Sequence, residues 1–431
     1  MDKETDFYDY NDLISDIKAH WCKDIVVILG DPFTGKTRLW NRLTATQEDV
    51  FSLSFKGYDV SLLPGLIHSE CQTWNDMFAW ICSQETYKYL IIDDADCGKN
   101  TEGFWNALID LHKDSNKLKV VLIAAKDTTP TELEHTTFEL SLMSWRKLSD
   151  HLDLTGKELK ELLCITGGYP EIMSEFSWHR PFEEKLAEVL TPGSAFWNLA
   201  PKILERHFSS VETYNTILYA MTQGNKALTT IAKASGMKNN ACLEYLKKLQ
   251  AKGLIRQKES QNGHKEYFIV NSYIYLWYAF VYTARLKADF SISDQTITIF
   301  DEKLRKEVYR RFFRTASLAY LKSFYFKNWS FDIINDELHQ DVTIDKVNFD
   351  YVGEDKYLHR MVLFKCGLIK TPLLKKALRA MKKIPLSDKE YVFLFTNKAI
   401  PRGCWSIAKK YDNVHIVQEK SLYRLRGLPN E

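Results

Sequence analysis

The sequence predicts an α/β protein in which a parallel sheet opens the chain and a second α/β segment closes it. Short apolar runs typical of buried strands, at residues 25–29, 89–92 and 120–125, alternate with segments of helical spacing up to about residue 143. The chain is then helical, with little strand character, to about residue 205. This order is typical of a parallel sheet with helices on both faces, followed by a helical segment.

The composition is that of an ordinary globular protein. The 431 residues are enough for two to four domains, and 45% of them are apolar and 26% charged. The net charge of +2 gives no overall field that would point to a polyanionic partner. No apolar run approaches the roughly 18 residues of a membrane helix, and the first residues do not form a signal peptide. The eight cysteines contain no C-x-x-C pair, so we expect reduced thiols in a cytoplasmic protein without membrane contact.

Residues 30–37, with the sequence GDPFTGKT, are the most informative segment. They match the phosphate-binding pattern G-x-x-x-x-G-K-[ST], with an apolar strand before them and a helical segment after them. The glycines let the loop wrap a phosphate so that backbone N–H groups point at it, and the helix N-terminus adds a favourable dipole. Lys36 would reach the β- and γ-phosphates, and the Thr37 hydroxyl would hold Mg²⁺. The residues expected to bind ATP are Gly30, Asp31, Pro32, Phe33, Thr34, Gly35, Lys36, Thr37 and Arg38.

The alternative for this segment is a glycine-containing turn without a ligand, and the acidic strand at residues 89–94 argues against it. The strand ends in Asp93 and Asp94. In P-loop enzymes the first acid supports the Mg²⁺ shell and the second polarises the attacking water, which assigns Asp93 and Asp94 to these roles. An aspartate reaches less far than the more usual glutamate, so we expect slow hydrolysis.

The third apolar run, at residues 120–125, ends without an obvious catalytic side chain. Many ATPases carry a polar sensor of the γ-phosphate at this place, but here the strand ends in two alanines. The possible substitutes are Lys126, Asp127 and Thr128. The missing sensor, together with Asp94, favours a slowly hydrolysing switch between ATP and ADP states.

A turn at residues 166–170, with the sequence TGGYP, lies roughly 130 residues after the phosphate-binding loop. With the loop and the Asp93-Asp94 strand, it resembles the archaeal-type ATPases, a branch of the signal-transducing (STAND) P-loop ATPases related to AAA+ proteins. That family has a Gly-Gly-x-Pro turn in a helical lid, where the proline packs near the adenine. The resemblance therefore implies that Gly168 and Pro170 line the base pocket and that residues 144–210 form the lid.

Residues 211–285 have the pattern of a winged helix. A short helix ending at Gly236 and a second helix at 239–252 have helix-turn-helix form, and a polar turn at 259–264 between strand-like runs would be the wing. The segment from 212 to 285 has ten Lys and Arg against four Glu. The sequence leaves two roles for this module, which are contact with DNA and packing between domains. The residues that could contact DNA are Lys238, Asn239, Asn240, Lys247, Lys248, Lys258 and Lys265.

An aromatic-rich run follows at residues 267–282. Interleaved aromatic side chains could stack on bases. We favour packing instead, because the same ATPase family closes its winged helix with a strand, an Asn or Asp, and an aromatic-rich helix, which this run resembles.

The final segment, 286–431, behaves as a separate α/β domain. In the ATPase family this module resembles restriction-endonuclease-like nucleases, which hold a divalent metal with an Asp at a strand end and a Glu-x-Lys on the next strand. Asp350 and Lys365 match this pattern, but Leu363 stands in the place of the metal-binding Glu and cannot ligate Mg²⁺. We therefore expect a nuclease-like fold without nuclease activity. The acids that could replace the missing ligand are Glu354 and Asp345.

Several basic residues of this domain form either a nucleic-acid surface or merely solvated helix faces. They are Lys365, Lys370, Lys375, Lys376, Arg379, Lys382 and Lys383.

The resemblance implies an Mg²⁺-dependent ATPase that works on or near DNA, with a protein partner or a homo-oligomer as further possibilities. The alternative is an ATP/ADP switch or scaffold for protein partners with no DNA role. The expected domains are 1–143 for the ATPase core with an N-terminal helix, 144–210 for the lid, 211–285 for the winged helix and 286–431 for the nuclease-like module. Arg146 and Arg180 are candidates for an arginine finger, and nothing in their spacing singles either out.

Overall fold

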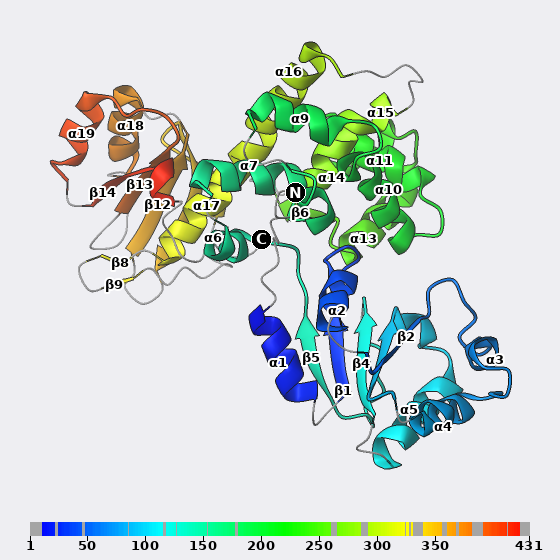
Figure 1. Ribbon diagram of the computed structural model, residues 1–431. Coiled ribbons are helices and arrows are strands. Elements are labelled where there is room, and N and C mark those ends of the chain that lie inside the picture. The colour runs from blue at the N-terminus through cyan, green and yellow to red at the C-terminus, as the bar shows by residue number, and fades with distance from the viewer. Residues whose placement is uncertain are drawn as a thin grey trace. The chain divides into compact units, whose positions relative to one another are not determined.

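The computed structural model of the chain forms two compact units. The first comprises Met1–Met143 and Tyr169–Ser174, and the second comprises Ser144–Gly168 and Glu175–Glu431 (Figure 1). The structure describes residues 11–21, 25–44, 48–84, 86–114, 118–125, 127–152, 154–176, 180–259, 265–285, 292–323, 325–326, 329–330, 339–355, 360–367, 370–381, 391–411 and 413–422.

A five-stranded parallel sheet forms the centre of the first unit, in the order β2-β3-β4-β1-β5. The strands are β1 (Ile25–Leu29), β2 (Val50–Ser54), β3 (Tyr89–Asp93), β4 (Lys119–Ala124) and β5 (His135–Glu139). The three central strands are almost entirely buried, as expected for runs of Val, Ile and Leu covered on both faces, whereas the edge strands β2 and β5 are half-exposed. The three strands predicted from apolar runs are therefore confirmed.

Helix α1 precedes these strands in the sequence, α2 to α5 lie between them, and α8 follows them. They are α1 (Asn11–Trp21), α2 (Lys36–Thr44), α3 (Leu63–Ile67), α4 (Trp74–Ser83), α5 (Glu102–Asp114) and the short α8 (Pro170–Met173). A capping box between Thr73 and Asp76 begins α4. One face of the sheet packs on a cluster of aromatic side chains in which the ring of Phe104 contacts both Phe55 and Trp74.

The order of the strands decides where a ligand can bind. The chain runs from β1 to the edge strand β2, returns through β3 and β4 to the side of β1, and then crosses to β5. Strand β1 is thus the point at which the direction of winding changes. In open parallel sheets ligands bind at the carboxyl ends of the strands beside such a point, and the loop that follows β1 lies there.

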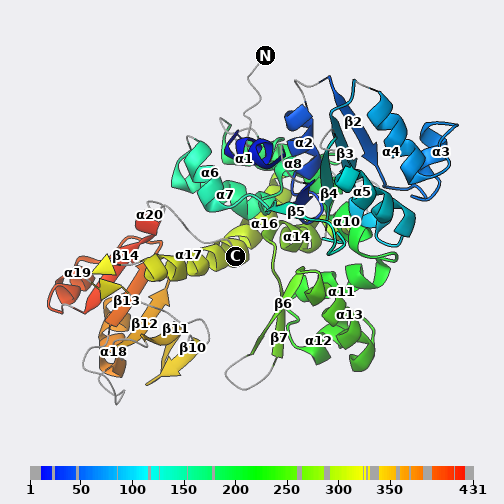
Figure 2. The ribbon, with the colours of Figure 1, turned by 90° about the horizontal axis from the view of Figure 1, so that it is seen from below.

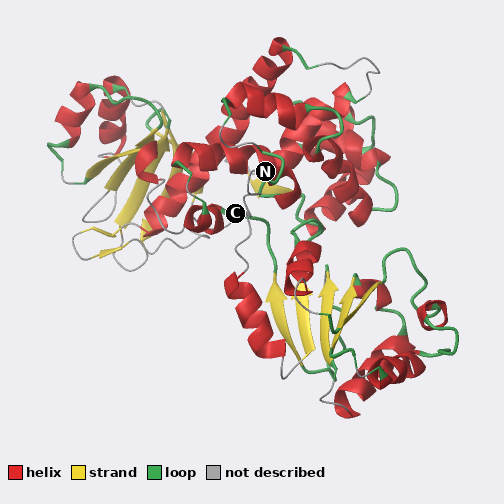
Figure 3. Ribbon diagram, viewed as in Figure 1, coloured by secondary structure: helices red, strands yellow, loops and turns green. Residues whose placement is uncertain are grey.

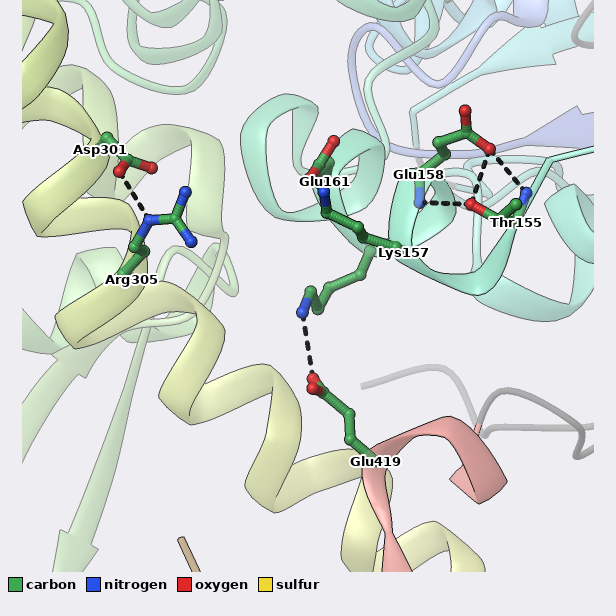
Figure 4. A network of polar contacts seen from close by, with 8 residues as sticks. Thr155, Lys157, Glu158, Glu161, Asp301, Arg305 and Glu419 are labelled. Carbon is green, nitrogen blue, oxygen red and sulfur yellow. Dashed lines mark hydrogen bonds and ion pairs between the residues drawn. The ribbon is translucent and has the colours of Figure 1, made fainter. Parts of the chain in front are cut away.

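The second unit begins with four helices. They are α6 (Trp145–His151), α7 (Gly156–Thr166), α9 (Phe182–Leu190) and α10 (Ala195–His207). A capping box of Thr155 and Glu158 begins α7, and Gly167 in the left-handed conformation, with φ 60°, ends it (Figure 4). The helical character predicted up to residue 205 is confirmed.

The flank of α7 carries a partly buried network of charges (Figure 4). The amine of Lys160 is 3.1 Å from a carboxylate oxygen of Glu419 in α20 (Glu419–Leu422), so an ion pair links the two helices. On the same flank burial raises the pKa of the Glu161 carboxyl, and Lys157, with its amine 3.7 Å away, opposes that shift.

Three helices and a hairpin follow. They are α11 (Glu212–Thr222), α12 (Leu228–Ala234), α13 (Asn239–Ala251), β6 (Ile255–Glu259) and β7 (Lys265–Ile269) (Figure 2). The two strands are antiparallel, and an isolated bridge joins Ala227, before α12, to Glu266 of β7. Buried Leu246 and Leu249 form the inner face of α13. The predicted turn of the wing falls mainly on residues 260–264, which lie outside the described residues.

The aromatic-rich run packs inside the second unit. It forms α14 (Ser272–Leu276), a π-helical turn (Trp277–Val281) and α15 (Tyr282–Ala284). The hydroxyl of Tyr273 accepts a hydrogen bond from the backbone N–H of Ala200 and donates one to the carbonyl of Phe196, both in α10. Tyr273 and Trp277 are buried, so the packing interpretation of this run is confirmed.

A mixed sheet ends the chain, in the order β10-β11-β12-β13-β14 (Figure 3). Its strands are β10 (His339–Ile344), β11 (Val347–Asp355), β12 (Arg360–Cys366), β13 (Tyr391–Thr396) and β14 (Val414–Gln418). The first three pair antiparallel and the last three parallel. The helices that precede or accompany it are α16 (Asp294–Lys303), α17 (Tyr309–Ser323), α18 (Thr371–Met381) and α19 (Arg402–Ala408). The expected α/β character of this segment is confirmed.

Among the described residues, no helix is both long enough and apolar enough to cross a membrane.

The turn after α7 yields a prediction about stability. A Cβ on Gly167 would lie 2.2 Å from the side-chain oxygen of Asn271, whereas a Cβ on Gly236, with a similar φ of 69°, would meet nothing within 4 Å. We expect Gly167→Ala to lower the thermal unfolding midpoint by about 5 °C or more, and the control Gly236→Ala by about 2–4 °C from backbone strain alone. Scanning fluorimetry measures both, and equal shifts would contradict the role of Asn271.

Candidate nucleotide-binding site

The loop after β1 begins at a position where only glycine fits. The N–H of Gly30 donates to the carbonyl of Ala124 at the end of β4, 3.3 Å away. A Cβ at Gly30 would lie 2.3 Å from the carbonyl oxygen of Leu140 and 2.8 Å from the hydroxyl of Thr34. Since contacts below 3.0 Å force a displacement of the backbone, the close packing between the ends of β4 and β5 requires Gly30.

The middle of the loop is tightly wound. Phe33 and Gly35 both have left-handed backbones, with φ of 66° and 95°. The hydroxyl of buried Thr34 donates to the carbonyl of Asp31 at 2.9 Å. A left-handed non-glycine residue such as Phe33 costs energy and is typical of functional loops, and successive turns of this kind direct backbone N–H groups into an anion-binding concavity.

Lys36 begins α2, and its side chain folds back over the loop. Its amine donates to the carbonyl oxygens of Gly30, at 2.5 Å, and Asp31, at 2.9 Å. The positive charge is therefore held at the mouth of the loop by two neutral acceptors. Arg38 lies in the same first turn and is half-buried, as is Pro32 in the loop.

Thr37 and Asp93 are 56 positions apart in the sequence, and the fold brings them together. The Thr37 hydroxyl donates to one carboxylate oxygen of Asp93 at 3.2 Å, and the other carboxylate oxygen accepts the N–H of Asp94 at 2.8 Å. The parallel arrangement causes this pairing, because the carboxyl ends of β1 and β3 open on the same edge of the sheet. A hydroxyl and a carboxylate at this spacing are oxygen ligands of the kind that Mg²⁺ takes.

Asp94 follows in a left-handed conformation, with φ 57° and ψ 36°, at the start of the 3₁₀ turn η1 (Ala95–Gly98). Such a conformation in an aspartate stores strain at the point where the strand ends. Asp96, two residues later, accepts a hydrogen bond from the N–H of Ala125 at 3.2 Å. Asp96 is not among the residues predicted from the sequence, although the third acid of the run Asp-Asp-Ala-Asp is a signal for it.

Of the residues proposed as γ-phosphate sensor or arginine finger, Asp127 and Arg180 form contacts with other side chains or backbone groups. The carboxylate of Asp127 accepts from the N–H of Thr129 and pairs with the ring of His135 at 3.2 Å. Arg180 forms an ion pair with Glu188. Thr128 is half-buried, and Lys126 and the side chain of Arg146 lie outside the described residues.

The two residues predicted to line the base pocket belong to different units. Pro170 begins α8 and is buried in the first unit, which also contains the loop. Burial raises the pKa of the neighbouring Tyr169 hydroxyl, and the negative charge of Asp31 raises it further, so this turn lies close to the loop. Gly168 belongs to the second unit, where its N–H donates to the hydroxyl of Thr166.

The two residues that match the nuclease pattern, Asp350 and Lys365, lie close together in the second unit. Asp350 is only 5% exposed, and one of its carboxylate oxygens accepts the N–H of Cys366 at 2.7 Å and lies 3.8 Å from the amine of Lys365. The other oxygen lies 3.5 Å from the guanidinium of Arg314 in α17, a residue that the sequence analysis missed. Both oxygens are thus committed to positive or hydrogen-bonding partners.

The residues around Asp350 offer little to a metal. Leu363 lies on β12 in register with Val352 of β11. Asp345 sits in the exposed turn between β10 and β11, separated from Asp350 by at least three residues of extended strand, or about 10 Å. The side chain of Glu354 lies outside the described residues. In the part of the chain that the structure describes, no group of three or more His, Cys, Asp or Glu could hold a metal ion.

Comparisons with known proteins found likeness to solved structures only. No model of a protein family and no curated protein matches the chain. A STAND protein with a tetratricopeptide-repeat sensor from Pyrococcus horikoshii matches at 18% identity and a TM-score of 0.29, over 73% of this chain and 50% of its own. The Aeropyrum pernix ORC1 protein in complex with DNA matches at 10% identity and a TM-score of 0.37, over 65% and 94%.

The replication initiator DnaA bound to AMPPCP and single-stranded DNA matches at 14% identity and a TM-score of 0.32, over 56% of this chain and 86% of its own. The chain spans about half the length of the Pyrococcus protein. At these TM-scores none of the likenesses carries an argument about function, which rests on the residues themselves.

The pairing of Thr37 with Asp93 predicts different effects for the two acids. Asp93→Asn should weaken Mg²⁺-dependent ATP binding about tenfold, because it removes the charge that supports the metal. Asp94→Asn should leave affinity within about twofold and slow hydrolysis about 100-fold, because the role expected for Asp94 concerns only the attacking water. Calorimetry and phosphate release measure these effects, with exposed Asp110→Asn in α5 as control. Equal losses of affinity in both variants would contradict this division of roles.

Proposed function

We propose that the protein is an Mg²⁺-dependent ATP-binding protein and slow ATPase of the archaeal type, related to AAA+ and STAND proteins. The single observation that supports this most is the Thr37 hydroxyl 3.2 Å from the Asp93 carboxylate, at the end of a loop that requires glycine at position 30. The loop after β1 and the carboxylate at the end of β3, the next strand but one, then open on one edge of a parallel sheet.

The triphosphate would take the place of the loop's own acceptors. Lys36 would exchange the carbonyls of Gly30 and Asp31 for phosphate oxygens, a gain because a charged acceptor binds an ammonium group more strongly than a neutral one does. The N–H groups of the wound loop and of the first turn of α2 would donate to the same phosphates. Thr37 and Asp93 would hold Mg²⁺, which neutralises charge on the β- and γ-phosphates.

Slow turnover is part of the proposal. Asp94 would orient the attacking water, and its carboxylate is one methylene shorter than that of a glutamate. Many ATPases have a polar side chain at the end of this strand that senses the γ-phosphate. Here the strand ends in alanines, and the backbone N–H of Ala125 is bonded to Asp96. These two features favour a protein that remains in the ATP state long enough to act as a switch for a partner.

The proposed domains follow the expected boundaries at 143, 210 and 285. Tyr169 and Pro170, packed beside the loop, would line the base pocket, with Gly168 forming the turn. The helices α11, α12 and α13 with the hairpin β6–β7 would form a winged helix. Exposed Lys238, Lys247 and Lys248 on α13 and at its start would contact duplex DNA.

The first test of the ATPase proposal is Lys36→Ala. We expect ATP affinity to fall at least about tenfold, because a charge-assisted hydrogen bond contributes about 1.5–3 kcal/mol, while the unfolding midpoint stays unchanged. Lys113→Ala, an exposed lysine in the last turn of α5, is the matched control. Hydrolysis measured with and without duplex DNA separates a DNA-dependent ATPase from a switch. Unaltered affinity and turnover in folded Lys36→Ala would refute the proposal.

A further expected outcome is the absence of DNA cleavage by the C-terminal segment. Asp350 is paired with Arg314 and Lys365, so Mg²⁺ would have to displace these cations, and the described residues offer no group of three ligands to hold it. Purified protein incubated with linear, supercoiled and single-stranded DNA in Mg²⁺ or Mn²⁺ should leave all three intact. Metal-dependent cleavage that disappears in Asp350→Ala or Lys365→Ala would overturn this expectation.

A further inference from the structure

The helices α18 and α19 pack on the same face of the second sheet and concentrate positive charge. Leu374 of α18 and Cys404 of α19 are both buried in the core below them. Residues 370–411 contain eleven Lys and Arg against two acidic residues, in a protein whose net charge is +2. The exposed cations among the described residues of this stretch are Lys370, Lys375, Lys376, Arg379, Lys398, Arg402, Lys409 and Lys410. This is the electrostatic footprint of a polyanion-binding surface.

Aromatic side chains stand among these charges. Arg402 and Trp405 of α19 and Lys409, which caps its C-terminus with a helical backbone, have the i, i+3, i+7 spacing of one helical face, and all three are exposed. Trp405 is 40% exposed and nearby Tyr411 is 41% exposed. The opposite face of α19 is fixed in the core by buried Cys404 and Ala408. The exposure of Trp405 is therefore a property of a well-packed helix.

The two aromatic residues border an open cavity of about 400 Å³. Lys409 and Tyr320 also line it, and its floor is the edge strand β14, which pairs only with β13 among the strands that the structure describes. The cavity thus combines aromatic rings, a lysine amine and the partly buried edge strand β14. Asp350 does not line it, so it is separate from the nuclease-like residues.

We propose that this surface, formed by Arg402, Trp405, Lys409, Lys410 and Tyr411, binds single-stranded nucleic acid. Unpaired bases would stack on Trp405 and Tyr411, and the three cations would contact the phosphates between them. Single strands are favoured over duplex because bases within a duplex are already stacked on each other, so their faces are not available to an exposed indole or phenol ring. The inference does not depend on ATP, on the winged helix or on metal binding.

The test uses the full-length protein and a fluorescent oligothymidylate, followed by anisotropy at low salt. The double variant Trp405→Ala/Tyr411→Ala should lose about tenfold in affinity, while Trp405→Phe, which retains a ring for stacking, should keep most of it. Tyr58→Ala removes an aromatic ring that is 59% exposed in the first unit and is the matched control. Quenching of tryptophan fluorescence by the oligonucleotide should be smaller in Trp405→Phe.

The role of the charges is tested by salt. Each phosphate contact on a single strand contributes about 0.7 to the slope of log affinity against log salt concentration, so Lys409→Ala/Lys410→Ala should reduce that slope by about 1.4. The same variant should leave the affinity for ATP unchanged, which distinguishes failure of this inference from failure of the ATPase proposal.

Three results would overturn the inference. They are an absence of binding to the oligothymidylate at low salt, a loss in Tyr58→Ala as large as that in Trp405→Ala/Tyr411→Ala, and an unchanged affinity in the double aromatic variant. With the first result, addition of an extended peptide to the edge of β14 would become the better explanation of the cavity.

Discussion

The close packing around Gly30 is the constraint on which the candidate site depends. The carbonyl of Ala124 accepts the Gly30 N–H on one side, and the carbonyl of Leu140 leaves no room for a Cβ on the other. With its first residue fixed between β4 and β5, the loop has to wind through left-handed Phe33 and Gly35 before α2 begins. That path brings Thr37, in the first turn of α2, to Asp93 at the end of β3. The geometry of the candidate site thus depends on sheet packing.

Helix α7 has a comparable role in the second unit. Its last turn ends at Gly167, whose carbonyl accepts a hydrogen bond from the side chain of Asn271 at 2.9 Å. The same side chain caps α14 by accepting the N–H groups of Tyr273 and Ile274. One residue therefore fixes both the turn that leads to Tyr169 and Pro170 and the start of the aromatic helix. The ion pair of Lys160 with Glu419 ties the flank of the same helix to α20.

Asp350 illustrates how two cations can compensate a buried carboxylate. A lone buried carboxylate would carry a large desolvation cost unless positive groups surround it. Arg314 and Lys365 provide that compensation for Asp350, and the N–H of Cys366 adds a hydrogen bond. The carboxylate that the sequence pattern compared with a metal ligand is thus part of a network with Arg314, Lys365 and Cys366.

The sequence by itself determined the three central strands of the first sheet, the glycine-containing loop after β1 and the acidic end of β3, because apolar runs and glycine positions are local properties that a pattern records. It also predicted the helical segment after residue 143 and the α/β character of the chain's end. Only the tertiary structure decided that Asn271 caps Gly167, that Arg314 pairs with Asp350, and that Asp96 binds the end of β4. These pairs join residues 29 to 104 positions apart, and their geometry depends on how helices pack on sheets, which no local pattern specifies.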